Sequence, residues 1–225
     1  MTPLTEFVML QCENESCRFR CPSNLSHREL DRCPICGSSI SVFGAPFTNP
    51  EVPSLSEAKP VRPLEVLLDN LRSTLNVGSI FRTSDGAGVR KIHLCGTTPT
   101  PDHPKIAKTG LGAEIKIPWE YHRNGLDMVS HARSQGFEVV SLEAAPESRS
   151  IFSYTAASDP SLPPILLVIG NEITGIDPEI LAVSDTILSI PMRGVKSSLN
   201  VAVAFGIAVY TLFTNTAILS KVSTR

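Results

Sequence analysis

Residues 190–204 read IPMRGVKSSLNVAVA, and this stretch decides the expected fold of the chain. It joins the apolar end of a short strand, at Ile190, to a long apolar helix through a loop that holds Gly194, an Arg, a Lys, two Ser and an Asn. A structural loop seldom needs so many hydrogen-bond donors directly before so hydrophobic a helix. We therefore expect a polar ligand at this loop.

The helix that follows is expected over 198–213 and is apolar on nearly all sides. A helix of this kind is expected to be buried on every side. In a chain of 225 residues, one face of a sheet rarely covers such a helix completely. The sequence therefore predicts that part of this helix packs against a second subunit.

Upstream of this stretch, from Leu64 onward, short β-type runs alternate with helical patterns. The run Ile165–Ile169 lacks polar alternation, as expected of a strand that is covered on both faces. This order predicts an α/β fold with a mainly parallel sheet and helices on both faces. The strands are expected at 65–68, 91–95, 114–117, 138–142, 165–169 and 186–190, and the helices at 78–87, 126–135, 178–182 and 198–213.

Cysteines cluster near the N-terminus in two pairs, Cys12 with Cys17 and Cys33 with Cys36. Zn²⁺ prefers four thiolates in a tetrahedron, and a Cys-Pro-x-Cys-Gly turn points two sulfurs inward. About forty residues cannot bury enough surface to fold unaided, whereas a structural zinc ion supplies folding free energy. Cys12, Cys17, Cys33 and Cys36 are the predicted metal ligands. Cys21 is an alternative ligand in the first pair, and ordinary reduced thiols are the alternative to a metal site.

The predicted organisation has three parts. Residues 1–44 form a domain like a zinc ribbon, residues 45–63 form a proline-rich linker, and residues 64–225 form the main domain. Each proline lacks a backbone donor and biases its predecessor towards extended geometry, which is typical of a linker. Cys95, at a strand end, is expected to be a small buried residue and not a nucleophile.

The composition suits a soluble α/β protein, with 42% hydrophobic residues and a formal net charge of -2. Tight nucleic-acid binders usually lean basic, so an acidic partner would have to meet a local basic patch. The longest strongly apolar run, Val201 to Phe213, is shorter than the about 20 residues that span a membrane. No basic start followed by an apolar stretch marks a secretory signal, so we expect a cytoplasmic protein with reduced thiols.

A polar loop, residues 69–83, follows the first strand of the main domain. Asn76 is expected to cap the next helix, and Arg82 to project from the start of that helix towards the loop. A guanidinium near a helix N-terminus suits phosphate or carboxylate recognition. Taken alone, an ordinary exposed helix arginine is the better explanation of Arg82, and the loop by itself proves little.

A further polar loop, residues 170–178, follows the buried run 165–169. Gly170 and Gly175 allow the backbone to approach a ligand closely, and ligands of open α/β sheets collect at the carboxyl ends of strands. Glu172 is either part of the site or a turn and capping residue. The loop lacks the G-x-G-x-x-G pattern, which disfavours a dinucleotide.

The three loops, in this order, resemble the three motifs of the SpoU/TrmH class of RNA ribose 2′-O-methyltransferases, in the SPOUT superfamily. The resemblance covers about 150 residues, from Leu64 to Phe213. The least regular position is Ser73-Thr74, before the first motif. The matching residues are Asn76, Gly78, Arg82 and Thr83 in the first motif, Gly170, Glu172, Gly175 and Ile176 in the second, and Ile190, Pro191, Met192, Gly194, Ser198, Leu199 and Asn200 in the third.

The resemblance implies a C-terminal trefoil knot, an exception to the rule that chains avoid knots. It also implies an enzyme that transfers a methyl group from S-adenosylmethionine to a ribose 2′-hydroxyl of tRNA or rRNA, in a reaction that needs no metal. An apolar slot with backbone donors and acceptors suits adenine. The implied cofactor-binding residues are Leu142, Gly170, Asn171, Gly175, Ile190, Met192 and Leu199.

Arg82 is implied to be the central catalytic residue. It acts either as a base, aided by the substrate phosphate, or as a group that holds this phosphate and stabilises the developing alkoxide. A pKa above about 12 makes arginine a poor base, so we prefer the second role. Asn76, Glu172, Ser198 and Asn200 are implied to orient Arg82 and the ribose.

The resemblance further implies a homodimer through helix 198–213, with Arg82 of one subunit near the cofactor of the other. RNA contacts are expected at basic side chains of the main domain. Two alternatives remain: a non-catalytic zinc-ribbon adaptor that binds RNA or protein, and a different α/β enzyme that binds a phosphorylated nucleotide. The presence of Arg82, Glu172 and Asn200 together argues against the adaptor. The expected basic contacts are Arg72, Arg90, Lys91, Lys105, Lys108, Arg193 and Lys196.

Overall fold

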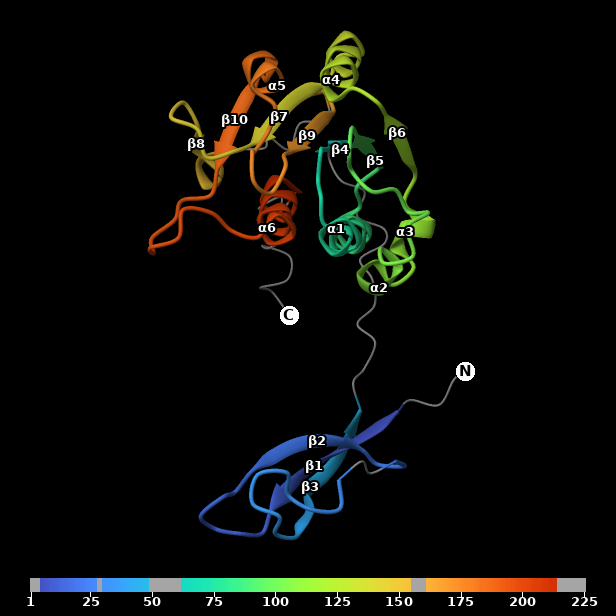
Figure 1. Ribbon diagram of the computed structural model, residues 1–225, viewed down its shortest axis with the longest axis vertical. Coiled ribbons are helices and arrows are strands. Elements are labelled where there is room, and N and C mark those ends of the chain that lie inside the picture. The colour runs from blue at the N-terminus through green and yellow to red at the C-terminus, as the bar shows by residue number, and fades with distance from the viewer. Residues whose placement is uncertain (1–4, 28–29, 49–61, 155–160, 214–225) are drawn as a thin grey trace. The chain divides into compact units, whose positions relative to one another are not determined.

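The computed structural model describes residues 5–27, 30–48, 62–154 and 161–213. The chain divides into two compact units, Met1–Glu57 and Ala58–Arg225. Figure 1 shows a small β-rich unit near the N-terminus and a larger α/β unit after it. Each unit has its own secondary structure and is described by itself.

The first unit is a three-stranded antiparallel sheet of order β2-β1-β3. Strand alternation buries Val8 and Leu10 of the central strand on one face. The third strand continues four residues into the segment predicted to be a linker, and 49–61 of that segment lie outside the described residues. The strands are β1 (Glu6–Cys12), β2 (Arg20–Asn24) and β3 (Ile40–Thr48).

The second unit contains a seven-stranded sheet of order β6-β5-β4-β9-β7-β10-β8. Every neighbouring pair in this sheet is parallel, which confirms the predicted α/β class. The strands are β4 (Leu64–Asp69), β5 (Lys91–Cys95), β6 (Trp119–His122), β7 (Glu138–Leu142), β8 (Arg149–Ser150), β9 (Ile165–Ile169) and β10 (Thr186–Ser189).

Helices cover both faces of this sheet, as predicted, with α4 and α5 on one side and α1 and α6 on the other (Figure 1). Two separate apolar clusters fill the two layers, one under each pair of helices. No helix in the described part of the chain has both the length and the apolar character that crossing a bilayer requires. The helices are α1 (Thr74–Ala87), α2 (Ala107–Gly110), α3 (Ala113–Lys116), α4 (Gly125–Ser134), α5 (Pro178–Val183), α6 (Val201–Phe213) and the 3-10 turn η1 (Ile151–Ser153).

One predicted strand is wrong. Residues 114–117 lie mostly in α3, and the edge strand β6 follows it. Leu111 and Gly112 have φ values of 50° and 93°, so the backbone turns in the left-handed region directly before the helix. The Glu114 carboxylate accepts a hydrogen bond from the Gly112 N–H at 3.0 Å, which favours a helical turn over an extended chain.

Two helix starts also differ from prediction. Helix α1 begins four residues earlier than expected, and Ser73, not Asn76, is its N-cap. The Ser73 hydroxyl accepts from the Asn76 N–H at 3.3 Å, so Asn76 lies inside the first turn. Helix α6 begins three residues later than expected, because the Asn200 side chain accepts from the Ala202 N–H at 2.9 Å.

Helix α6 is not buried on every side within one subunit. Phe205, Ala208 and Val209 are fully buried against the sheet and α1. Val203 and Tyr210 are 53% and 50% exposed. An apolar helix therefore keeps one side open in the single chain.

Candidate functional site

A cavity of about 640 Å³ opens at the carboxyl ends of three adjacent strands, β9, β7 and β10. This is the edge of a parallel sheet at which ligands usually bind. The walls come from the loops after these strands, from the start of α1 and from the segment that leads into α6. The lining residues include Leu142 and Glu143 at the end of β7, 169–173 at the end of β9, Ser189, Ile190 and Met192 at the end of β10, 197–201 and Ala204, and Arg72, Ser73 and Asn76.

A chain of hydrogen bonds joins the three polar loops at this cavity. The Asn200 side-chain amide donates to the Asn76 Oδ1 at 3.1 Å. The Asn76 amide in turn donates to the Glu172 Oε1 at 2.9 Å. Residues that are 96 and 124 positions apart in the sequence are thus fixed in one network.

Glu172 is the centre of this network. Its Oε2 accepts from the Arg72 N–H at 2.9 Å, and its Oε1 accepts from the Ser73 N–H at 3.1 Å. Burial alone would raise the pKa of Glu172, but the hydrogen bonds from the Arg72 N–H and the Asn76 amide lower this pKa below its ordinary value. Glu172 is therefore ionised at neutral pH, and it holds the start of α1 against the loop after β9.

Two glycines of the loop after β9 allow a close backbone approach. A Cβ atom on Gly170 would lie 2.3 Å from the Ile176 nitrogen, so no other residue fits there. Gly175 has a φ of 75°, a conformation that favours glycine. The two glycines therefore let the loop after β9 close tightly on itself at this wall of the cavity.

Asn171 holds the loop itself. Its Oδ1 accepts from the Ile173 N–H at 2.8 Å, and its Nδ2 donates to the Asn70 carbonyl at 2.6 Å. The Asn171 N–H donates a hydrogen bond to the Gly175 carbonyl, and the Gly175 N–H donates one to the Asn171 carbonyl, both at 3.0 Å. The Asn171 side chain is thus used to shape the turn.

The structure brings most of the predicted site residues together. All seven residues that were expected to bind the cofactor line the 640 Å³ cavity: Leu142, Gly170, Asn171, Gly175, Ile190, Met192 and Leu199. Four of the five predicted catalytic residues line it as well: Asn76, Glu172, Ser198 and Asn200.

Arg82 is the exception. It is exposed on α1 and lines a separate cavity of about 490 Å³. Its neighbours there include Lys108, and the remaining lining residues are Ser79, Thr83, Thr109 and Tyr210. Within one subunit, Arg82 does not line the cavity that holds the other four predicted residues.

Sequence reasoning missed Glu143. It lines the main cavity directly after β7, and its Oε2 accepts from the Ile176 N–H at 3.0 Å. Glu143 directly follows the buried strand β7, and a polar residue at the carboxyl end of a buried strand is the pattern that identified the other loops. The same pattern could have identified Glu143.

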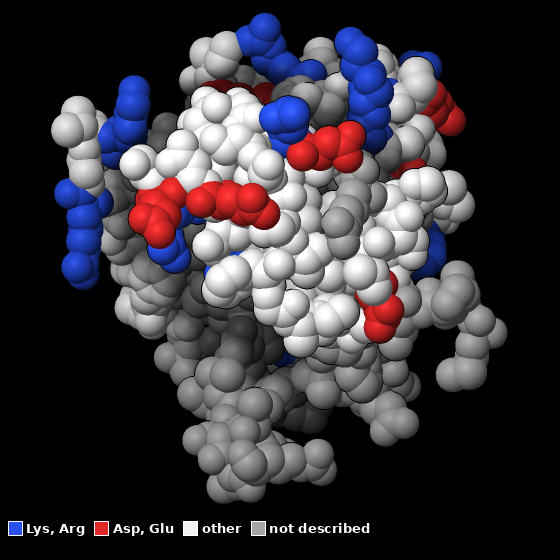
Figure 2. Space-filling view, turned by 90° about the horizontal axis from the view of Figure 1, so that it is seen from below, with Lys and Arg blue, Asp and Glu red and all other residues white. Residues whose placement is uncertain are grey.

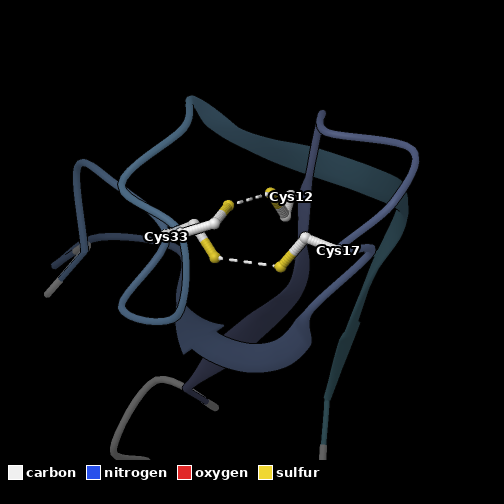
Figure 3. Close-up of side chains that lie close together, drawn as sticks. Cys12, Cys17 and Cys33 are labelled. Atoms are coloured by element: carbon white, nitrogen blue, oxygen red, sulfur yellow. Dashed lines mark hydrogen bonds between the residues drawn. The ribbon is translucent and has the colours of Figure 1, made fainter.

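In the first unit, the sulfurs of the four predicted metal ligands face one another. Figure 3 shows the labelled side chains of Cys12, Cys17 and Cys33 pointing into one space. The sulfur atoms of Cys12 and Cys36 are 3.5 Å apart, and those of Cys17 and Cys33 are 3.7 Å apart. A tetrahedron with Zn–S bonds of about 2.3 Å has sulfur–sulfur edges of about 3.8 Å, so the spacing fits a Cys₄ zinc site.

The two other cysteines lie elsewhere. Cys21 is on β2 and does not belong to the group of four. Cys95 is fully buried, and burial raises its pKa to about 12. This agrees with the expectation that Cys95 is a packed residue, because its reactive thiolate form is scarce at neutral pH.

The basic residues form no uniform surface in the view of Figure 2. Lys and Arg side chains stand next to Asp and Glu side chains on the face that is drawn. Two of the candidate RNA contacts are already paired with acidic residues. The Lys91 Nζ lies 2.6 Å from the Glu120 Oε2, and the Arg90 Nε lies 3.8 Å from the Glu65 Oε1.

Together, the parallel sheet, the cavity at its carboxyl edge and the three linked loops define an α/β protein with a cavity large enough for a nucleotide-sized ligand. The family model of the SpoU rRNA methylases matches residues 63–210. The chain belongs to this family.

Individual relatives are similar over about two thirds of the chain. It is 31% identical over 150 residues to the tRNA (guanosine(18)-2′-O)-methyltransferase of Escherichia coli K12, which covers 65% of this chain and 61% of the relative. It is 30% identical over 149 residues to the 23S rRNA (guanosine(2553)-2′-O)-methyltransferase RlmP of Bacillus subtilis, covering 65% and 56%. The chain thus spans about six tenths of the length of these relatives.

Solved structures are similar too. The AdoMet-bound rRNA methyltransferase of Sinorhizobium meliloti superposes with a TM-score of 0.62 at 28% identity, over 79% of this chain and 64% of the other. The TrmH/SpoU tRNA modifying enzyme of Aquifex aeolicus superposes with a TM-score of 0.62 at 27% identity, over 72% and 79%.

Proposed function

We propose that the protein is an S-adenosylmethionine-dependent RNA methyltransferase that modifies a ribose 2′-hydroxyl of tRNA or rRNA. The observation that carries this proposal is the hydrogen-bond chain Asn200–Asn76–Glu172, at a cavity lined by all seven expected cofactor residues. Family membership and the names of the relatives, which are guanosine 2′-O-methyltransferases, support the reaction class.

The cavity fits S-adenosylmethionine. Its volume of about 640 Å³ lies in the range of small-molecule sites. Apolar walls for an adenine ring come from Leu142, Ile190 and Leu199. Gly170, which has no side chain, offers its main-chain groups at the same cavity. When bound, this cofactor supplies a methyl group that its sulfonium charge activates.

The residues of the chain then position the nucleophile. Glu172 fixes Asn76, and Asn76 fixes Asn200. These two amides and the Ser198 hydroxyl, which lines the same cavity, orient the ribose so that its 2′-oxygen faces the methyl group. Correct alignment supplies much of the rate in this chemistry, because the hydroxyl is a weak nucleophile.

Arg82 completes the site from a second subunit. In this arrangement, its guanidinium holds the substrate phosphate and stabilises the developing alkoxide charge. Its separate cavity, shared with Lys108, supports a role in anion binding. The apolar residues on the open side of α6, Val203 and Tyr210, support a homodimer through this helix.

We also propose that the first unit is a zinc ribbon with Cys12, Cys17, Cys33 and Cys36 as ligands, and that the second unit carries the trefoil knot of its family. The sulfur–sulfur distances of 3.5 and 3.7 Å support the zinc site. The knot rests on family membership alone.

The test of the function is methyl transfer to RNA. The full chain is incubated with labelled S-adenosylmethionine and, separately, with total tRNA and ribosomal RNA, and ribose methylation is mapped. We expect labelled 2′-O-methyl groups at a defined nucleotide with wild type, and none with Asn200→Ala. Cofactor binding without any transfer to either RNA would contradict the proposed activity and favour the non-catalytic adaptor.

A further inference from the structure

A second group of polar side chains lies far along the sheet from the cofactor cavity. Glu65, His93, Glu120 and His122 come from the three adjacent strands β4, β5 and β6. His93 pairs in register with Leu67 and Glu120, and His122 pairs with Cys95. Because side chains alternate along a strand, all four point to the face that carries α4 and α5.

His93 is buried at 3% exposure, and both of its ring nitrogens have a partner. Its Nε2 lies 2.8 Å from the Glu65 Oε2, and its Nδ1 lies 2.9 Å from the His122 Nε2. The hydrogen bond from His93 lowers the pKa of Glu65, which is therefore an ionised acceptor. With its Nε2–H donated to Glu65, a neutral His93 accepts the Nε2–H of His122 at its Nδ1, and a metal ion can replace this hydrogen bond once the His122 proton lies on Nδ1 of His122.

Three ligand atoms converge at the Nδ1 of His93. The His93 Nδ1, the His122 Nε2 and a Glu120 carboxylate oxygen all lie within 4.8 Å of one another. The separation between the His122 Nε2 and the Glu120 Oε2 is 3.9 Å. Two imidazoles and one carboxylate form a ligand set that zinc uses when it keeps an open fourth position.

We propose that His93, His122 and Glu120 bind a Zn²⁺ ion, separate from the Cys₄ site, and that Glu65 positions His93 for it. A metal-binding histidine usually donates its other ring N–H to a carboxylate, and Glu65 stands in that place. This inference does not depend on the methyltransferase function, because no group of the cofactor cavity takes part.

Exposure and one neighbouring charge set the conditions for binding. The His122 side chain is 20% exposed, so an ion from solvent can reach it. Lys91, in contrast, places its Nζ 2.6 Å from the Glu120 Oε2 and competes with the ion for this carboxylate. Glu120 is 54% exposed and free to turn from Lys91 to the metal.

Arg90 contacts the positioning residue. Its Nε lies 3.8 Å from the Glu65 Oε1, and its side chain is 70% exposed.

The test is a titration of the full chain with Zn²⁺ by calorimetry, after zinc has filled the Cys₄ site and excess metal has been removed. We expect one further ion per chain in wild type. Glu120→Gln and His122→Ala change partly exposed side chains and should lower the affinity for this ion at least about 10-fold. Glu65→Gln, which alters the carboxylate that positions His93, should have a similar effect. Lys91→Met should raise the affinity for this ion, because the ammonium group that competes for Glu120 is removed.

The matched control is His103→Ala, which removes an exposed histidine of the second unit that is not a proposed ligand. Co²⁺ gives a second readout, since nitrogen and oxygen ligands lack the intense sulfur-to-cobalt absorption of the Cys₄ site. The proposal is overturned if wild type binds no ion beyond the Cys₄ site. It is equally overturned if the further ion binds Glu120→Gln and His122→Ala as tightly as wild type.

Discussion

Glu172 joins two loops through one carboxylate, so its charge state controls how well they are held. Its pKa is lowered from the ordinary value of 4.5 in the folded protein. A carboxyl group with a lowered pKa contributes stability above its unfolded pKa, and this contribution is lost as the pH falls through the folded value. The network should therefore be intact at neutral pH and weakened in acid.

We predict that Glu172→Gln lowers the free energy of unfolding by about 1 kcal/mol or less at pH 7, since solvent screens an exposed carboxylate. The difference from wild type should shrink below pH 4.5, the ordinary glutamate value. Trp119 is the only tryptophan of the chain and lies in the second unit, so its fluorescence during urea unfolding reports on that unit. Glu147→Gln, at an exposed glutamate, is the control. An equal difference at pH 7 and pH 3 would contradict this role.

Arg82 gives a second prediction at the scale of one residue. Arg82→Ala should reduce methyl transfer by about 100-fold or more, because a donor to developing charge is lost. Binding of S-adenosylmethionine, measured by calorimetry, should be unchanged, because Arg82 does not line that cavity. Lys116→Ala, at an exposed basic residue of α3, should leave both unchanged. Full activity of Arg82→Ala would refute the catalytic role.

At the scale of elements, two helix glycines provide a matched pair. A Cβ atom on Gly78 of α1 would lie 2.3 Å from the Thr109 hydroxyl and 2.4 Å from the Ile106 carbonyl. A Cβ atom on Gly206 of α6 would meet only a Thr83 methyl group at 3.9 Å. Because Gly78 has no side chain, α1 can pack directly against residues 106–110 at α2. Gly206, in contrast, has room for a side chain.

We expect Gly206→Ala to raise the free energy of unfolding by about 0.5–1 kcal/mol, the gain of alanine over glycine inside a helix. Gly78→Ala should lower it by about 1–3 kcal/mol through overpacking. Urea unfolding followed by Trp119 fluorescence measures the free energy of unfolding of both variants. Equal effects of the two substitutions would mean that the contact between α1 and α2 is not tight.

The same scale shows what the sequence predicted well. The bounds of β5, β7 and β9 were correct because the run Ile165–Ile169 and its neighbours are apolar and bordered by polar loops. Residues 114–117 were misassigned because the left-handed turn at Leu111 and Gly112 overrides their β-like pattern. The start of α1 was missed because Ser73, not Asn76, supplies the capping oxygen.

The site was predictable wherever the signal is a polar residue at the end of a buried strand. That rule placed Gly170 and Glu172 at the cavity, together with the segment 190–200. It could not place Arg82, because a residue more than two turns into a helix faces a direction set by packing. In this chain Arg82 lines a different cavity, and its proposed role requires the proposed association between subunits.

At the scale of the whole molecule, the first unit should depend on metal. We predict that Cys33→Ser unfolds residues 5–48 and removes zinc, because a small sheet of this kind needs the ion to fold. Cys21→Ser, outside the group of four, is the matched control and should keep the zinc. Zinc content and limited proteolysis measure the two effects, and Trp119 fluorescence should stay native in both variants. Zinc loss in Cys21→Ser alone would reassign the ligands.

Association is the other property of the whole molecule. Val203→Glu should convert a dimer to monomers, since a charge on the open side of α6 would be buried at the interface. Light scattering after size-exclusion chromatography measures the mass. Ile115→Glu, at a residue of α3 that is 85% exposed, should leave the mass unchanged. A monomeric wild type would contradict the proposed interface.

The hydrogen bond between Asn76 and Asn200 spans 124 positions of the chain. During synthesis on a ribosome, the first loop emerges long before the partner that completes it. The cavity is therefore among the last features of this unit to form, because a nascent chain that stops short of residue 197 lacks the wall made by residues 197–201 and Ala204.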